Sequence, residues 1–170
     1  MAREFVVRDA ARIFATIERC FLLSTSIEIV QRTLGMHPVA AESKRSTGLI
    51  EAGDQLIWRG WIFGLPQMHE TLITGFDPPH FFQDTMGRGR FASFHHDHHF
   101  TAETTAADGR PCTLLEDAVH FALPLGLAGT MVGSLVMVPH VRGLVRRRFA
   151  LLKQIAEGDE WQRYLSAETA

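Results

Sequence analysis

The feature that most constrains this chain is a series of strand-like segments, joined by short turns, that precedes one long helical stretch. The segments are rich in β-branched and aromatic residues, and the turn signals EAGD, GLP, DPP, GRG and AADGRP separate them. Connections this short favour antiparallel neighbours. We predict strands over Val39–Ser46, Gln55–Phe63, Pro66–Thr74, His80–Met86, Phe91–Thr101 and Cys112–Leu123.

Strand and helix signals also occur before this series. The segment EFVVR, residues 4–8, alternates in the manner of a first strand. A helix over about Asp9–Arg19, capped by the aspartate, is expected next. Thr25, with Glu28 three residues later, forms a capping-box pattern for a second helix that Gly35 closes. Two short helices are therefore predicted after the first strand.

The C-terminal part of the chain is predicted to be helical. Apolar residues recur there at threes and fours, which is the pattern of an amphipathic helix: Leu135, Val138, Val141, Val145, Leu152 and Ile155. Pro139 should kink this helix or start its second half. The segment GDEWQRYL predicts a short terminal helix capped by Asp159.

This order of elements predicts an α+β fold, in which a curved antiparallel sheet of about seven strands wraps around the long C-terminal helix. A strongly curved sheet cannot leave its apolar face in water, and the long helix is the element available to cover it. Where the lining side chains do not fill the space between sheet and helix, a ligand cavity remains.

Composition limits the classes of function. With 170 residues, of which 46% are hydrophobic, the chain is expected to form one domain, residues 1–170, with a substantial core. The formal charge of −2 gives no general attraction to nucleic acid. Cys20 and Cys112 lie far apart without ligand spacing, which predicts reduced thiols in a cytoplasmic protein. The N-terminal segment has no long apolar stretch, so no secretory signal is expected.

An uncharged stretch over residues 121–138 is about long enough to cross a bilayer. Arginines follow it, which is a pattern also found beside membrane spans. Pro124 and three glycines interrupt its first half, and a single soluble domain needs the segment for its core. We therefore predict a buried loop and helix here, with no stable membrane insertion.

The segment FASFHHDHHF, residues 91–100, contains four of the nine histidines. Because side chains alternate along a strand, Phe94, His96, His98 and Phe100 share one face, while His95, Asp97 and His99 share the other. The phenylalanines mark the first face as interior. His96 and His98 are therefore predicted to face the cavity, and the other three polar side chains to face solvent.

Two further polar residues are predicted to point inward. Asp117 shares a strand face with Leu115, Val119 and Phe121, and a buried carboxylate is costly unless it is paired. Arg148 lies within the apolar stripe of the C-terminal helix. It could bind a ligand carboxylate or phosphate, extend its guanidinium to the helix edge, or pair with Asp117.

Five segments form an ordered set of motifs: GDQLIWRGWIFGLP, ITGFDPPHFFQD, GRGRFASFHHDHHF, CTLLEDAVHFALPLG and LVRRRFALL. Between Phe5 and about Leu152 this set resembles the cyclase/dehydrase-type branch of the SRPBCC (START-like, helix-grip) superfamily. The resemblance implies the helix-grip fold and an internal pocket for a hydrophobic ligand. It does not imply one reaction, because members include polyketide aromatase/cyclases as well as lipid and hormone carriers.

Three interpretations of the inward polar group remain open. His96, His98 and Asp117 can form a structural network that gives the pocket a polar end. A histidine oriented by Asp117 can serve as general base or acid in ring closure and dehydration of a polyketide-like substrate. His96 and His98 can also ligate zinc, if Asp117 or His69 supplies a third ligand.

Our first functional hypothesis is a binding protein for a small hydrophobic molecule, either lipid-like or polyketide-like, that needs no cofactor. Its expected ligand contacts are Trp58, Trp61, Phe94, His96, His98, Phe100, Asp117 and Arg148. The second hypothesis is a cyclase/dehydratase in which His96, His98 and Asp117 are catalytic. The third is an interaction protein without a small ligand. An uncovered edge strand would also permit a homodimer.

Overall fold

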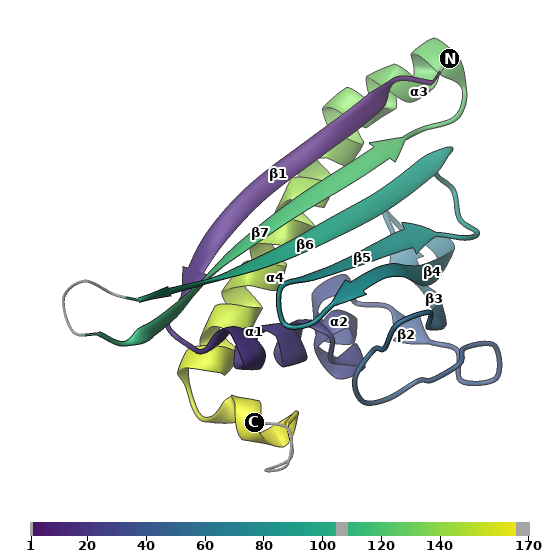
Figure 1. Cartoon of the computed structure of the whole chain (residues 1–170). Coiled ribbons are helices and arrows are strands. Elements are labelled where there is room, and N and C mark those ends of the chain that lie inside the picture. The colour runs from purple at the N-terminus through teal and green to yellow at the C-terminus, as the bar shows by residue number, and fades with distance from the viewer. Residues whose placement is uncertain (1, 105–108, 166–170) are drawn as a thin grey trace.

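One antiparallel sheet forms the framework of the protein, as a computed structural model of residues 2–104 and 109–165 describes it (Figure 1). The spatial order of its seven strands is β1-β7-β6-β5-β4-β3-β2. The strand bounds are β1 Glu4–Ile13, β2 His37–Pro38, β3 Gln55–Ile62, β4 Leu65–Asp77, β5 Phe81–Met86, β6 Ser93–Thr104 and β7 Pro111–Ala122. The predicted number of strands and their antiparallel pairing are confirmed, whereas the predicted turn at AADGRP lies partly outside the described residues.

Two predictions in the first part of the chain are wrong, namely a helix start at Asp9 and a strand over Val39–Ser46. β1 continues to Ile13, so Asp9 lies within a strand and opposite Asp117 of β7 rather than at a helix start. Ten consecutive pairs with β7 outweigh the local preference of Asp9 for a helix cap. The segment Val39–Ser46 is not a strand, because pairing with β3 is limited to His37 and Pro38.

Two short helices follow β1, as predicted, but their first residues differ from the prediction. α1 covers Ile17–Ser24, and the side chain of Thr16 accepts a hydrogen bond from the Arg19 N–H at its start. α2 covers Ile27–Leu34 and follows Ser26 rather than Thr25. Gly35 ends α2 in the left-handed conformation, with φ 65°, which confirms the predicted stop.

The C-terminal helix consists of three consecutive segments, namely α3 (Gly126–Val132), the π-helical η1 (Gly133–Met137) and α4 (Val138–Glu157). Pro139 stands at the start of α4, as predicted. Proline lacks the N–H that an α-helix would use four residues back, and the wider turn of η1 accommodates this interruption. A 3-10 turn, η2 (Glu160–Arg163), follows, and Asp159 precedes it without capping through its side chain.

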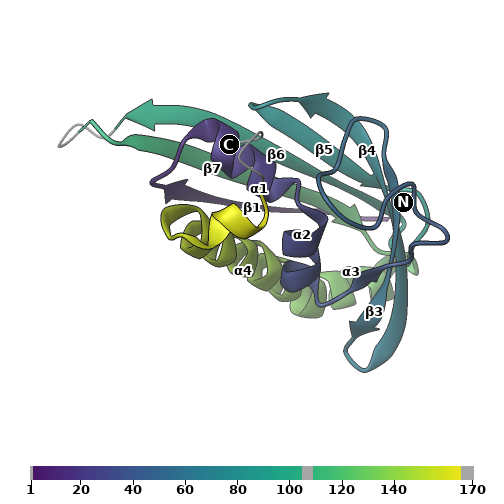
Figure 2. The same ribbon diagram turned by 90° about the horizontal axis from the view of Figure 1, so that it is seen from below.

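The core lies between the sheet and the helices, which share one of its faces (Figures 1 and 2). α4 contributes Val141, Val145, Phe149, Leu152 and Ile155, all of which are buried. Between Gly126 and Glu157 the chain is long and apolar enough to cross a membrane by length and composition. The stripe that α4 buries identifies this half as the core helix of the fold.

The prediction that residues 121–138 are buried is wrong for α3 and η1. Leu127, Met131 and Leu135 are exposed, although Gly133 packs against the ring of Phe5. Figure 1 shows the reason, because α3 lies at the end of the sheet where β1 begins and β7 ends. Little of the sheet face is therefore left to cover this part of the helix.

Candidate functional site: a cavity with a histidine–aspartate end

A cavity of about 200 Å³ lies between the sheet and α4. Its walls are mainly apolar and come from α2, β3, β4, β5, β6, β7, η1 and α4. They include Ile29, Trp58, Ile73, Phe82, Phe94, Val119, Met137 and Val145. Met68 and Arg90 line the cavity and are also exposed, so they mark the side that opens to solvent. This size suits a ligand below that of a typical drug, whose pockets are ~300–1,000 Å³.

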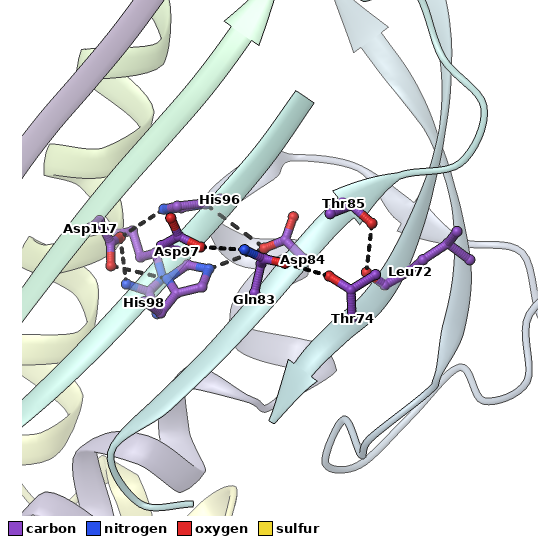
Figure 3. A network of polar contacts seen from close by, with 10 residues as sticks. Leu72, Thr74, Gln83, Asp84, Thr85, His96, Asp97, His98 and Asp117 are labelled. Atoms are coloured by element: carbon purple, nitrogen blue, oxygen red, sulfur yellow. Dashed lines mark hydrogen bonds and ion pairs between the residues drawn. The ribbon is translucent and has the colours of Figure 1, made fainter. Parts of the chain in front are cut away.

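Five polar side chains gather at one part of the cavity wall (Figure 3). His98 lies between two carboxylates, with its Nδ1 3.0 Å from Asp117 Oδ1 and its Nε2 3.1 Å from Asp84 Oδ2. Arg148 reaches the same group from α4, and its Nη1 donates to Asp117 Oδ2 at 2.7 Å. His96 Nε2 lies 3.3 Å from Asp117 Oδ2, without hydrogen-bond geometry.

Strand register brings these groups together. β6 lies between β5 and β7, and His96 faces Asp84 while His98 faces Asp117 as direct cross-strand pairs. Directly opposite residues on neighbouring strands have adjacent side chains. The ring of Phe82 stacks on His98 at a centroid distance of 4.0 Å, which fixes the plane of the imidazole. Four of the five groups are thus positioned by backbone pairing of three central strands.

Electrostatics keeps the two carboxylates ionised. Burial alone would raise the pKa of Asp117, but Arg148, His98 and His96 together outweigh it and hold this pKa well below its ordinary value. Burial likewise opposes ionisation of Asp84, and the hydrogen bond from His98 with the nearby imidazoles lowers its pKa on balance. The pKa of His96 is lowered, chiefly by burial and then by His98. The group therefore combines two carboxylates, one guanidinium and a neutral His96.

Comparisons with known proteins identify the fold. No protein-family profile matches the sequence, and no curated protein matches it significantly. A protein from Thermus thermophilus superposes with TM-score 0.66 at 16% identity, covering 89% of this chain and 99% of the other. A START superfamily protein from Mycobacterium smegmatis gives 0.59 at 14% identity, with coverages of 88% and 98%. The chain has the helix-grip fold.

A plant enzyme has the same helix-grip arrangement. Truncated norcoclaurine synthase from Thalictrum flavum superposes with TM-score 0.62 at 9% identity, covering 93% of this chain and 97% of the other. Identities this low establish the architecture alone. The expected helix-grip fold, with an antiparallel sheet around a C-terminal helix, is thereby confirmed.

The helix-grip cavity includes most, but not all, of the predicted ligand contacts. Trp58, Phe94, His96, His98 and Arg148 line it, and Asp117 is buried directly behind the two imidazoles. The two remaining aromatic residues lie elsewhere, which corrects the prediction for both. Trp61 is 70% exposed because it lies three residues after Trp58 in β3 and therefore on the opposite face of the strand, and Phe100 packs on Phe21 in the core rather than against the cavity.

Sequence analysis missed Asp84 and His140. Asp84 follows Phe82 by two residues, so the alternation applied to the other strands would have placed it on the inner face of β5. His140 lines the cavity from α4, and its ring contacts that of Phe63 at a centroid distance of 4.8 Å. No signal in the sequence pairs His140 with Phe63, because one comes from a helix and the other from a hairpin turn.

The outer face of β6 has its own polar group, as predicted. His95 stacks on His120 of β7 at a centroid distance of 4.3 Å, and Asp97 accepts a hydrogen bond of 2.6 Å from the Gln83 amide. His99 is exposed. The histidine-rich segment therefore divides into an inner pair at the cavity and an outer set on the opposite side of the sheet.

Proposed function

We propose that this protein binds a small, largely apolar molecule in its cavity and orients it through a polar group at the histidine–aspartate end. The observation that carries the proposal is a buried donor without a partner among the described residues. Arg148 uses Nη1 on Asp117, and its Nη2 is buried in the cavity wall with no hydrogen bond. An unsatisfied buried donor costs ~1–3 kcal/mol, which an acceptor atom of a ligand would recover.

The surroundings of Arg148 favour a neutral acceptor over an anion. The polar end already holds two ionised carboxylates, Asp84 and Asp117, and one guanidinium, which contacts Asp117 alone, so a third negative charge would meet net repulsion. Among the described residues, Nη2 is the one nitrogen of Arg148 that is both fully buried and without a partner, whereas a carboxylate ligand prefers two parallel hydrogen bonds. A carbonyl or hydroxyl oxygen on an otherwise apolar molecule suits this donor. The ligand class is therefore a small ketone, aldehyde or alcohol with an apolar body.

Three probes of similar size test this function: ethylbenzene, acetophenone and benzoate. We expect acetophenone to bind most tightly, as measured by titration calorimetry and by the fluorescence of Trp58, which lines the cavity. Val145→Phe should fill the cavity and remove binding, while Trp61→Phe, on an exposed side chain, should leave the affinity unchanged. Tighter binding of benzoate, or equal binding to both variants, would contradict the proposed ligand class.

A second candidate function is acid–base catalysis of the cyclase/dehydratase type, which a specific observation favours. His98 lines the cavity, and both of its ring nitrogens are at hydrogen-bond distance from carboxylates that hold the ring in place. A proton that the imidazole removes from the substrate in ring closure can be returned to the departing hydroxide in dehydration, which leaves both carboxylates ionised. Here His98 exchanges the proton, while Asp117 holds the ring and His96 completes the wall. On a polyketide-like substrate, His98→Ala should abolish turnover while affinity stays within a few-fold.

The setting proposed for this function is a single-domain cytoplasmic protein that does not bind nucleic acid. Both cysteines are free and buried, in keeping with a reducing compartment. β1 ends the sheet on one side, and its ten residues offer an edge for pairing with a second copy. A homodimer through β1 stays a prediction, and sedimentation velocity at several concentrations tests it.

A further inference from the structure

Asp117 orders two imidazoles at once. Its Oδ1 lies 3.0 Å from Nδ1 of His98, and its Oδ2 lies 3.3 Å from Nε2 of His96. Each ring consequently turns its other nitrogen toward Asp84, whose Oδ2 is 3.1 Å from His98 Nε2 and 3.9 Å from His96 Nδ1. Figure 3 shows the two rings between the two aspartates.

The spacing of these three atoms matches that of a metal-ligand set. Zinc binds imidazole nitrogen at ~2.0–2.1 Å and carboxylate oxygen at ~2.0–2.2 Å, so two ligands of a tetrahedral site lie ~3.3 Å apart. The distances of 3.1 Å and 3.9 Å lie on either side of this value, and all three ligand atoms fall within 4.8 Å of one another. Small side-chain movements are sufficient to close the set.

We propose that Asp84, His96 and His98 bind a divalent transition-metal ion of the zinc class in the cavity wall. Two imidazoles and one carboxylate are ligands that Zn²⁺ and Co²⁺ accept, whereas Mg²⁺ and Ca²⁺ prefer oxygen alone. The remaining coordination position faces the cavity, which both imidazoles line. The proposed set differs from the sequence-based zinc hypothesis in its third ligand, which is Asp84 in place of Asp117 or His69.

Asp117 and Arg148 support the site from behind. Imidazoles that bind a metal usually donate their second N–H to a carboxylate, which fixes the ring and its tautomer. Asp117 has this position toward His98 and lies 3.3 Å from Nε2 of His96, without hydrogen-bond geometry there, and Arg148 holds it in place through a 2.7 Å contact with Oδ2. The group holds two carboxylates and one guanidinium, so a cation also balances the buried charge. Asp117 is therefore a positioning residue and not a ligand.

A second group, His95, Asp97 and His120, lies on the outer face of the same strands and also falls within metal-ligand spacing. Its two rings are almost parallel, with 13° between their planes. Because imidazole lone pairs lie in the ring plane, parallel rings do not direct them to one point. His96 and His98 are tilted by 42°, so their lone pairs can converge. The outer group thus provides a control that has the same residue types.

Calorimetric titration of the chelator-treated full chain with Zn²⁺ tests the proposal. We expect one ion per chain, and at least tenfold weaker binding for Asp84→Ala or Asp84→Asn. The double variant His95→Ala/His120→Ala should bind like the original protein. The proposal is overturned if the original protein takes up no ion, or if the outer double variant loses binding while both Asp84 variants keep it.

The visible spectrum of the Co²⁺-loaded protein gives a second readout that does not depend on these variants. Nitrogen and oxygen coordination should produce ligand-field bands, and unchanged aqueous Co²⁺ bands at protein excess would refute the site. Asp117→Asn should retain the bands but weaken the affinity by ~10–100-fold, as expected for a partner of metal-bound histidine. An unaltered affinity in that variant would remove the positioning role. Ligand binding in the cavity is measured separately and does not depend on this outcome.

Discussion

Replacement of Arg148 by methionine is the most direct test of how the polar end is stabilised. Arg148 and Asp117 are buried, with 8% and 3% of their surfaces exposed, and their contact is 2.7 Å. Methionine retains the apolar stem and removes the guanidinium, which leaves an ionised carboxylate in the core. Loss of one partner of a buried pair typically costs ~3–5 kcal/mol.

The structure places the expected loss at the lower end of that range. Asp117 would keep the N–H of His98 at 3.0 Å, so the carboxylate retains one strong hydrogen bond. We therefore expect a decrease in unfolding free energy of ~3 kcal/mol. With an unfolding entropy of ~2.1 cal/mol/K per residue, a chain of 170 residues should lose ~8 °C in Tm.

Urea denaturation at pH 7, followed by circular dichroism, measures this loss. Arg147→Met is the matched control, because the neighbouring arginine is exposed and its replacement should change stability by less than ~0.5 kcal/mol. Adding Asp117→Asn to Arg148→Met removes the stranded charge and should recover ~2 kcal/mol. Equal stability of the two arginine variants, or no recovery in the double variant, would refute the argument.

Three further predictions concern other parts of the molecule. Burial raises the pKa of Cys20 to about 11, and Cys112 is also buried. At pH 8, 5,5′-dithiobis(2-nitrobenzoate) should therefore detect no fast-reacting thiol in the native protein and two thiols after denaturation. A fast-reacting thiol in the native protein would contradict this. A Cβ on Gly129 would lie 1.9 Å from the Pro124 carbonyl oxygen, so Gly129→Ala should lower the Tm, whereas Gly143→Ala, with no atom within 4 Å and inside α4, should stabilise by ~1 kcal/mol. Trp61 should dominate acrylamide quenching, because it is 70% exposed, whereas Trp58 is buried and Trp161 is half-buried with the Arg19 guanidinium over its ring; unchanged quenching in Trp61→Phe would show that the β3–β4 turn is covered.

The order of elements was predictable because each local pattern agrees with the final fold from β3 onward. Alternation identified the inner faces of β6 and β7, and the helix stripe identified the inward direction of Arg148. Near the N-terminus local and long-range preferences conflict. Asp9 is a good helix cap, but the pairing of β1 along β7 determines its conformation.

The composition of the site was less predictable than its location. Sequence patterns show which side of a strand a residue occupies, and short turns favour consecutive strands as neighbours, but neither gives the register of pairing. The register of β5 with β6 places Asp84 opposite His96 and so brings this carboxylate to the imidazoles. Trp61 was misplaced for a different reason, because it lies three residues after Trp58 in β3, and alternation puts the two side chains on opposite faces of the strand.

The sequence HHDHH places histidines on both faces of β6, so a slip of one position would still bring imidazoles to the inner face, and the histidines do little to define how the strand aligns with its neighbours. Phe94 and Phe100 define it, because such a slip would move both rings from the inside of the sheet to water. Burying a phenylalanine is worth ~1.5–3 kcal/mol, so the correct alignment gains several kcal/mol from these two residues. The two aromatic rings at the ends of the segment therefore determine which histidines become internal, and with them the chemistry of the cavity.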